Sequence, residues 1–501
     1  MFGSVLVANR GEIAVRIVRA LRDMSIRSIA VFSDADRGAL HVRMADEAAH
    51  IGPAASAESY LHQDRILEAA QKHRADAIHP GYGFLSENAE FAAACAREGM
   101  VFVGPSAESI RRLGSKTAAR ILAKQAGAPV VPGSEKPAND VEHARALARE
   151  VGYPVLLKAS AGGGGKGMRR VNAESELESA IRDATSEAER AFQNGEIYIE
   201  KVIEQARHIE IQIAGDHYGN LVHLGERECS LQRRHQKIVE ECPSPWVAQH
   251  PDLRAAMGAA ALKIARAAGY DNLGTVEFLA DNRGNFYFLE VNTRLQVEHP
   301  VTELVTGYDL VQLQLRIAAG EALPFSQSDV RWQGWAMECR VCAEDPETNF
   351  FPSPGMIVQL REPSGPGVRL DSGVYPGWTV PLEYDPLLAK LITWGPDRNA
   401  AMQRLRRALG EYTITGVETN VAFFREILDD PEFRAGNIST EFVANFFARR
   451  KLRAEPAAQL DLAVALAAAA YAKPRLLTSA AQHRECVDSR WVTLGRDQLL
   501  Q

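Results

Sequence analysis

The stretch Glu290-Val-Asn-Thr-Arg-Leu-Gln-Val-Glu298 gives the strongest indication of fold and chemistry in this chain. Residues 286–292 have the aromatic and β-branched composition of a strand, on which residues two apart share a face. Glu290 and Asn292 therefore point the same way. A cation, an amide and an acid then alternate after the strand, as expected of a reaction site: Arg294, Gln296 and Glu298.

Glu277 lies in a second strand-like segment, residues 275–279, just before the turn at residues 281–284. If the two segments pair, Glu277 joins Glu290 and Asn292 in an all-oxygen set. Such hard ligands suit Mg²⁺ carrying nucleotide phosphates, and they do not suit zinc or iron. The alternative is a surface hairpin with solvated carboxylates.

The composition is that of an ordinary soluble protein of about three domains. Of the 501 residues, 46% are apolar and 24% charged, with a net charge of −7, which argues against a broad nucleic-acid surface. We expect no membrane span, since the longest apolar run, residues 462–472, is too short, and no signal peptide. Six scattered cysteines favour a reducing, cytoplasmic location.

Short apolar strands alternate with helical patterns over residues 1–115, which predicts a parallel α/β layer. The Ala8–Gly11 turn before the helix at 13–24 is not a dinucleotide fingerprint. The loop His79-Pro-Gly-Tyr-Gly-Phe-Leu-Ser-Glu-Asn88 follows a strand, where open α/β sheets bind ligands. A tight turn into the next helix explains this loop equally well.

The segment Ala161-Gly-Gly-Gly-Gly-Lys-Gly-Met168 holds five glycines within six positions, after a strand that contains Lys158. Its backbone N–H groups and Lys166 predict a mobile, phosphate-covering lid, and the spacing is not that of a Walker A loop. A merely flexible loop is the alternative. Similarly, the basic cluster 233–237 is either a solvated face or, through Lys237, a charge that assists phosphoryl transfer.

Four segments together resemble biotin carboxylase, the ATP-grasp component of biotin-dependent acetyl-CoA, acyl-CoA and pyruvate carboxylases. They are residues 79–88, Lys158 with its glycine loop, residues 226–237 and residues 290–303, and the resemblance covers about residues 1–450. It implies an ATP-grasp architecture that mixes α/β and α+β parts. The implied division is an N-terminal biotin carboxylase domain (1–115), a linker and lid (116–204), the ATP-grasp catalytic domain (205–330), a biotin carboxylase C-terminal domain (331–450) and a helical tail (451–501).

The resemblance also implies a reaction and a set of residues. MgATP (or MnATP) activates bicarbonate as carboxyphosphate, and biotin is then carboxylated. ATP would contact Lys116, Lys158, Gly163, Gly164, Gly165, Gly167, Met168, Glu200, Lys201, Ile203, His208, Gln232, His235, Glu277, Leu279 and Glu290. Metal would be held by Glu277, Glu290 and Asn292. Bicarbonate would bind Lys237, Arg294, Gln296 and Val297, with Glu298 as base, and biotin would meet Tyr82, Arg340 and Asp385.

No Ala-Met-Lys-Met sequence is present, so biotin is expected as a substrate on a separate carrier protein that also serves a carboxyltransferase subunit of an acyl-CoA or pyruvate carboxylase. Arg16 and Arg19 match arginines near a homodimer interface. Arg340 could instead be an ion-pair partner of Glu338 or Asp345. Two other functions are considered: an ATP-grasp ligase joining a carboxylate to an amine, and a silent regulatory subunit. The tail is expected to pack on its own domain or on a partner.

Overall fold

The computed structural model describes residues 1–134, 137–138, 140–159, 168–192, 195–234, 236–450 and 464–468. The chain separates into two units, residues 1–446 and residues 447–501. In the second unit residues 464–468 are helical and exposed, within the tail predicted to be helical over 451–501. The remainder of the predicted tail elements lies outside the described residues. None of the described helices has the length and apolar character needed to cross a bilayer.

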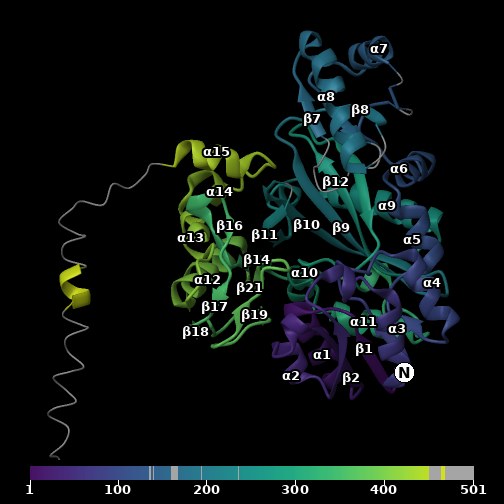
Figure 1. Ribbon diagram of the computed structural model, residues 1–501. Coiled ribbons are helices and arrows are strands. Elements are labelled where there is room, and N and C mark those ends of the chain that lie inside the picture. Colours follow the sequence, from purple (N-terminus) through teal and green to yellow (C-terminus); the bar gives the residue numbers. More distant parts are fainter. Residues whose placement is uncertain are drawn as a thin grey trace, which may run out of the picture. The chain divides into compact units, whose positions relative to one another are not determined.

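The amino-terminal region is a five-stranded sheet in the order β3-β2-β1-β4-β5, and every pairing in it is parallel (Figure 1). The predicted parallel α/β layer is confirmed. β1 (Ser4–Val7) is buried along its whole length, as expected of a strand covered on both faces. The other elements are α1 (Gly11–Asp23), β2 (Arg27–Ser33), α2 (Leu40–Met44), β3 (Glu47–Gly52), α3 (Gln63–Lys72), β4 (Ala77–His79), α4 (Ala89–Arg97), β5 (Val101–Phe102) and α5 (Ala107–Gly114).

A three-stranded antiparallel sheet, in the order β7-β6-β8, forms the region predicted as the lid. Alternate residues of β6 (Val155–Ala159), Val155 and Leu157, are buried in one apolar cluster with Ala184 and Ala188 of α8 (Glu174–Phe192). The glycine segment itself, residues 161–167, lies outside the described residues. The other elements here are α6 (Lys116–Gln125), α7 (Val141–Val151), β7 (Met168–Val171) and β8 (Ile197–Lys201).

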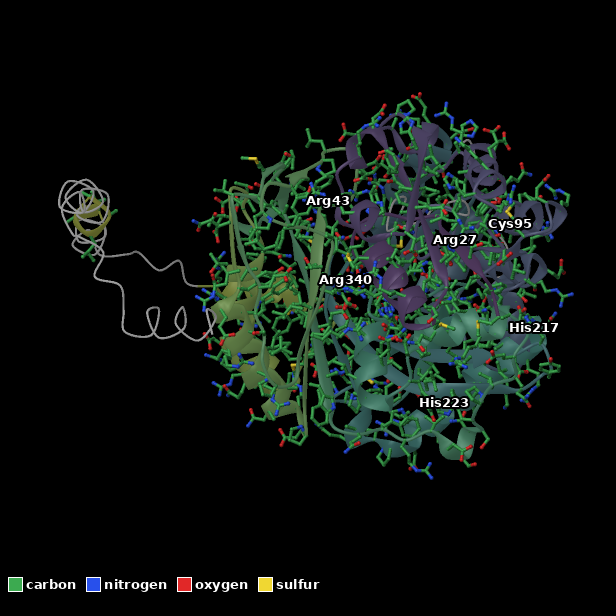
Figure 2. All side chains as sticks on the ribbon, turned by 90° about the horizontal axis from the view of Figure 1, so that it is seen from below. Arg27, Arg43, Cys95, His217, His223 and Arg340 are labelled. Atoms are coloured by element: carbon green, nitrogen blue, oxygen red, sulfur yellow. The ribbon has the colours of Figure 1, made fainter. Side chains whose placement is uncertain are left out.

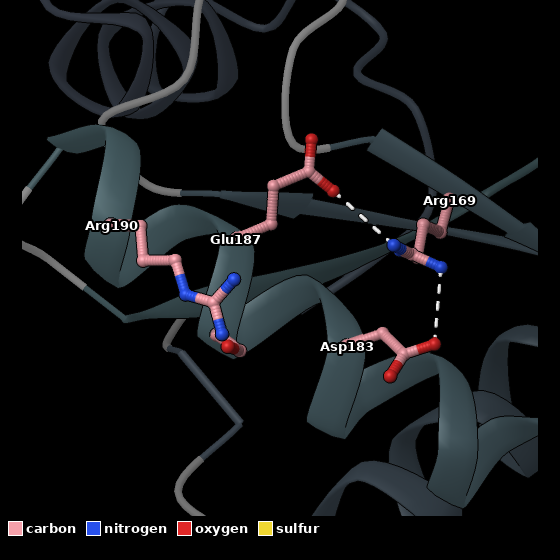
Figure 3. A pocket seen from close by; sticks show the side chains of 5 residues that line it. Arg169, Asp183, Glu187 and Arg190 are labelled. Atoms are coloured by element: carbon pink, nitrogen blue, oxygen red, sulfur yellow. Dashed lines mark hydrogen bonds and ion pairs between the residues drawn. The ribbon is translucent and has the colours of Figure 1, made fainter.

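A pocket on this region lies between β7 and α8 (Figure 3). Arg169 reaches from β7 toward α8, where its guanidinium lies 3.3 Å from Asp183 and 3.3 Å from Glu187. These side chains are exposed, so their ion pairs contribute little to stability. None of the five residues that line this pocket belongs to the predicted site, which lies on the larger sheet described next.

The largest sheet has eight strands in the order β13-β12-β9-β10-β11-β14-β21-β19 (Figure 1). β11 pairs with β14, with Val239 opposite Cys339, so the sheet runs without a break across the predicted boundary at residue 330. The domain boundaries themselves stay predictions. The strands are β9 (Arg207–Gly215), β10 (Leu221–Arg233), β11 (Gln236–Cys242), β12 (Asn272–Ala280), β13 (Phe286–Asn292), β14 (Trp335–Cys342), β19 (Val368–Ser372) and β21 (Leu387–Gly395).

Proline and glycine set the ends of the helices beside this sheet. α9 (Pro251–Ala268) begins with proline and ends at Gly269, which adopts the left-handed conformation that favours glycine. α10 (His299–Thr306) has Pro300 in its first turn and ends at Gly307 in the same way. Because α10 starts directly after Glu298, its beginning fixes the position of that carboxylate. α11 (Leu310–Ala318) follows.

Between β21 and residue 450 the structure describes four helices. Pro431 starts one of them, because proline is tolerated in the first turn of a helix. The helices are α12 (Arg398–Glu411), α13 (Val421–Asp429), α14 (Pro431–Ala435) and α15 (Phe442–Arg449). The short strands of this region are β15 (Glu344–Asp345), β16 (Phe351–Pro352), β17 (Gly355–Met356), β18 (Gln359–Arg361), β20 (Thr379–Val380) and β22 (Thr413–Thr415).

Candidate active site

The predicted pairing of two strands is confirmed, and it brings three oxygen-bearing side chains together. In the register of β12 and β13, Glu277 lies opposite Glu290, and Thr275 lies opposite Asn292. Directly opposed residues of an antiparallel pair point to one face, as do residues two apart on a strand. Glu277, Glu290 and Asn292 therefore share one face of the sheet.

The ammonium group of Lys237 is the centre of the charged cluster on this sheet. Its Nζ lies 2.7 Å from Glu277 Oε1 and 2.8 Å from Glu298 Oε1. A third carboxylate, Glu210 on β9, lies 2.5 Å away. Burial lowers the pKa of Lys237, but the three carboxylates outweigh it and raise that pKa well above its ordinary value. Lys237 is therefore a fixed positive charge, and the solvated alternative for the basic cluster does not describe it.

Two groups of potential metal-binding atoms meet at Lys237. The ligand atoms of His208, Glu210 and Glu277 lie within 4.8 Å of one another, and so do those of Glu210, Cys229 and Glu298. The Lys237 ammonium contacts a carboxylate of each group, so the positive charge at this point is already supplied by the protein. We assign no metal to these two groups.

The predicted metal ligands Glu277, Glu290 and Asn292 suit Mg²⁺ or Mn²⁺ better than these two groups do. They offer two carboxylates and an amide, the oxygen ligands that these ions prefer. Nδ2 of Asn292 is buried without a hydrogen-bond partner among the described residues, while its Oδ1 accepts from Arg294 at 3.1 Å. Lys116 Nζ lies 2.9 Å from Glu290 Oε2. This edge of the sheet thus gathers negative charge that Lys116 and Lys237 balance.

Glu298 is fully buried directly before α10 and contacts two cations. The Lys237 ammonium donates to Oε1 of Glu298, and the Arg340 NH2 group donates to Oε2 at 2.9 Å. Burial raises the pKa of Glu298, but the charges of Lys237 and Arg340 have the larger effect and hold that pKa well below its ordinary value. The carboxylate is therefore ionised at neutral pH, as a group that accepts a proton must be.

Arg340 projects from β14, a strand far along the chain from the metal edge (Figure 2). Its Nε donates to Glu240 Oε1 at 2.6 Å, and its NH2 group reaches Glu298. The ion pairs that the structure describes for Arg340 are thus with Glu240 and Glu298, and the considered pairing with Glu338 or Asp345 is wrong. Glu240 lies one hundred residues away in sequence, so only the pairing of β11 with β14 makes it a neighbour.

Arg294 is held by a residue that the sequence did not single out. Its Nε donates to Glu87 Oε2 at 2.9 Å, and Glu87 Oε1 accepts from the Thr293 backbone at 3.0 Å. The Arg294 NH1 group reaches Gln296 Oε1 at 3.2 Å. Because Glu87 belongs to the loop 79–88, this loop serves the site by orienting Arg294. The sequence feature that could have identified Glu87 was its position near the end of a loop predicted to bind ligand.

The predicted nucleotide residues come from both antiparallel sheets. Lys158 on β6 forms an ion pair with Glu200 on β8, and Arg120 of α6 lies 3.3 Å from the same carboxylate. Lys201 donates to the carbonyls of Gly152 and Tyr153 at 2.7 and 2.9 Å. Ile203, just after β8, is half-buried, as are Met168 at the start of β7 and Leu279 on β12.

On the larger sheet, two of the predicted nucleotide residues contact each other. Gln232 Nε2 donates to His208 Nδ1 at 2.9 Å, and Nε2 of that histidine lies 3.0 Å from Glu277 Oε2. Gly163, Gly164, Gly165, Gly167 and His235 lie outside the described residues, as does the glycine loop predicted as the lid. Their assignment to ATP stays a prediction.

All three predicted biotin residues, Tyr82, Arg340 and Asp385, line one cavity of about 440 Å³. Arg294 and Val297 of the bicarbonate set line it too, so the two predicted substrate regions are continuous. The cavity is also lined by Phe84 of the loop 79–88 and Gln236 of the basic cluster, and by Arg10, Glu12 and Tyr384, which the sequence did not indicate.

A buried lysine supports the bicarbonate side of this cavity. Lys390 on β21 is fully buried and donates to the Val297 carbonyl at 2.9 Å. Its charge is met by Glu12 at 3.2 Å, a residue of α1. These two contacts join three distant parts of the chain, and the local sequence around Lys390 gives no indication of them.

Family models match the chain in three consecutive parts. They are described as the biotin carboxylase N-terminal domain (residues 1–110), the carbamoyl-phosphate synthase L chain ATP-binding domain (115–326) and the biotin carboxylase C-terminal domain (338–445). Biotin carboxylase 1 of Bacillus subtilis is 52% identical over 447 residues, which is 89% of this chain and 99% of that protein. The chain belongs to the biotin carboxylase family.

Two further comparisons extend this assignment. A biotin carboxylase of Nostoc sp. is 53% identical over 442 residues, which is 88% of this chain and 98% of that protein. The biotin carboxylase domain of Hydrogenobacter thermophilus 2-oxoglutarate carboxylase, crystallised as a dimer with MgADP, ADP and bicarbonate, superimposes with a TM-score of 0.85 at 47% identity. That match covers 89% of this chain and 98% of the domain. The ATP-grasp fold expected from the sequence is thereby confirmed for this biotin carboxylase family member.

Proposed function

We propose that the Lys237 cluster and the adjoining cavity carry out ATP- and bicarbonate-dependent carboxylation of biotin held by a separate carrier protein. As a member of the biotin carboxylase family, the chain is an ATP-dependent ligase, and biotin carboxylation is the first half-reaction of a biotin-dependent carboxylase. One observation carries the assignment of the site. Glu298 is an ionised, buried base between Lys237 on the phosphate side and Arg340 on the cavity side.

Bicarbonate is assigned to the space beside Lys237, Arg294 and the Val297 backbone. Arg294 presents a planar fork suited to a carboxylate-like anion, and Glu87 holds that fork in place. Gln296 lies within reach of both Arg294 and Glu277, at 3.2 and 3.5 Å. Glu298 would remove the bicarbonate proton, and the anion would then attack the terminal phosphate of ATP, breaking its bond to ADP, to give carboxyphosphate and ADP.

Glu277, Glu290 and Asn292 would hold the Mg²⁺ or Mn²⁺ of the nucleotide. When bound, the ion supplies positive charge at the phosphates being transferred. Lys116 contacts Glu290 and Lys237 contacts Glu277, so each lysine adds positive charge beside one of these carboxylates. Lys158, Glu200, Lys201, Ile203, His208, Gln232 and Leu279 are assigned to the rest of the nucleotide, together with Met168 of the predicted lid.

The cavity lined by Tyr82, Arg340 and Asp385 is assigned to the biotin ring. Arg340 would stabilise negative charge on the ureido oxygen while the ring nitrogen is carboxylated, and such help is strongest in a partly dry pocket. CO₂ released from carboxyphosphate would have a short path, because Arg294 and Val297 line the same cavity.

The partners of this reaction are a biotin carboxyl carrier protein and a carboxyltransferase, and the chain is proposed to form a homodimer. Arg16, which matches an interface arginine, is mostly buried and bound within the chain to Glu303 at 3.0 Å and Asp309 at 2.8 Å. Arg19 on the same helix is exposed and available to a second copy. Sedimentation should give twice the mass of the chain, and a concentration-independent monomer would contradict the dimer.

The assignment is tested by measuring ATP cleavage by the purified protein with Mg²⁺. Cleavage should require bicarbonate and should be stimulated by free biotin. A ligase that joins a carboxylate to an amine would not respond to biotin, and a silent regulatory subunit would cleave no ATP under either condition.

A further inference from the structure

Two fully buried carboxyl groups share one face of the large sheet with Arg340. Glu240 on β11 and Glu338 on β14 are directly opposed in the antiparallel register, so their side chains leave the sheet on the same face and start close together. Arg340, two residues beyond Glu338, shares this face. None of the catalytic roles argued above makes use of Glu338.

Three of the four oxygens of these two groups have no hydrogen-bond partner among the described residues. Oε1 of Glu240 accepts from Arg340, but Oε2 of Glu240 and both oxygens of Glu338 are buried and unsatisfied. Two adjacent, desolvated carboxylates that are both ionised repel each other strongly, whereas a pair that shares one proton forms a short hydrogen bond instead. A shared proton therefore removes the repulsion and satisfies two of the three oxygens, one on each glutamate.

The charges around the pair favour placing the proton on Glu338. Arg340 binds Glu240 directly, while Lys390 on β21 binds the Val297 carbonyl and Glu12 and lowers the pKa of Glu338 by less than burial raises it. Glu298 and Lys237 are the other charged groups that act on the pair. Burial raises the pKa of Glu338 well above its ordinary value, and it raises the pKa of Glu240 only to about 7 because Arg340 opposes it.

We propose that Glu338 and Glu240 are a proton-sharing pair that positions Arg340 for the biotin step. The Glu338 carboxyl donates to Oε2 of Glu240, and the anionic Glu240 holds Nε of Arg340. With Nε fixed, the guanidinium can turn only its outer edge toward Glu298 and the cavity. This inference rests on the proposed role of Arg340 in biotin carboxylation, and both glutamates act through Arg340 without touching substrate.

The experiment compares Glu338→Gln with Glu338→Ala. A glutamine amide can donate to Oε2 of Glu240 as the protonated carboxyl does, whereas alanine leaves that oxygen unsatisfied. Carboxylation of free biotin should fall about tenfold or more in Glu338→Ala, and Glu338→Gln should restore most of it. Bicarbonate-dependent ATP cleavage without biotin should change much less in both variants, because Arg340 serves the biotin step.

Glu240→Gln tests the other half of the pair. It removes the charge that holds Arg340, so it should impair biotin carboxylation and should raise the KM for biotin more than that for ATP. The matched control is Glu241→Gln on the same strand. Glu241 is also buried, but it binds Arg398 and Trp335 and makes no contact with Arg340 among the described residues. The control should report a generic loss of stability with an unchanged ratio of the two activities.

The protonated carboxyl also has a spectroscopic signature. The infrared carbonyl band of a protonated carboxyl group should be stronger in the wild-type protein than in Glu338→Gln, so that the difference spectrum contains the band of one protonated carboxyl. The inference would be overturned if Glu338→Gln were as defective as Glu338→Ala, or if that band were unchanged. Failure of the proposed function would look different, since the wild-type protein itself would then form no carboxybiotin.

Discussion

The Lys237 ammonium lies 2.8 Å from Oε1 of Glu298, and this ion pair is the point at which the phosphate side and the biotin side of the site meet. Lys237 also touches Glu277 of the metal edge, and Glu298 also touches Arg340 of the cavity. A single buried base thus lies between two cations with different assignments. Variants of these residues should separate the two halves of the reaction.

Glu298→Gln should lower bicarbonate-dependent ATP cleavage by about 10²-fold or more, as expected when a general base is lost. Glutamine keeps the size and most contacts of the side chain but cannot take the proton. Nucleotide affinity, measured by calorimetry, should change little. A variant that retained more than about a third of wild-type cleavage would exclude Glu298 as the base.

Arg340→Ala should affect the two activities unequally. Carboxylation of free biotin should be nearly lost, while biotin-independent ATP cleavage should keep a larger share of its wild-type rate, because Arg340 is assigned to the ureido oxygen. Both rates are measured on the same preparation. Equal proportional losses, with normal ATP binding, would show that the division between the two steps is wrong.

Glu87→Gln should raise the KM for bicarbonate by about tenfold, corresponding to the loss of one charge-assisted hydrogen bond to Arg294. The KM for ATP should stay close to its wild-type value. Glu90→Gln is a suitable control, since Glu90 is exposed and pairs only with Arg111 among the described residues. If Glu87→Gln and the control behaved alike, the loop 79–88 would have no part in holding Arg294.

Removing the divalent ion with a chelator should abolish ATP cleavage, and adding Mg²⁺ should restore it. Glu290→Gln should raise the Mg²⁺ concentration needed for half-maximal activity, because one carboxylate ligand is lost. The direct readout is Mn²⁺ binding in the presence of nucleotide, followed by magnetic resonance. Unchanged Mn²⁺ affinity in Glu290→Gln would argue against the proposed metal edge.

Glu12 should make folding stability depend on pH near neutrality. Burial raises the pKa of Glu12 from 4.5 to about 7. The folded state therefore holds this proton more tightly than the unfolded state, and the resulting stability is present below pH 4.5 and lost as pH rises through 7. The contribution is at most about 3 kcal/mol. Chemical denaturation of Glu12→Gln between pH 5 and 8 should show a smaller decline than the wild type, and an equal decline would refute this.

Local sequence pattern was sufficient where the site lies on adjacent strands. The two-residue period placed Glu290 and Asn292 on one face, and the short turn at 281–284 made β12 the partner that adds Glu277. The family motifs also supplied Arg340, Tyr82 and Asp385, which line one cavity.

Contacts between distant segments could not be read in this way. Glu240 reaches Arg340 because β11 pairs with β14, and Glu87 reaches Arg294 across 207 positions of the chain. Such contacts depend on tertiary packing, which no local periodicity encodes. Lys390 was missed for the same reason, since its buried charge is explained by Glu12, Asp371 and the Val297 carbonyl, all from distant parts of the chain.

The most direct test of the proposed reaction is the fate of labelled bicarbonate. The purified protein is incubated with MgATP, free biotin and radiolabelled bicarbonate, and labelled carboxybiotin is measured together with ADP and phosphate. Label should enter biotin only when ATP is present, and Glu298→Gln should suppress both products. Cleavage of ATP without any label in biotin, or label incorporation independent of ATP, would contradict the proposed reaction.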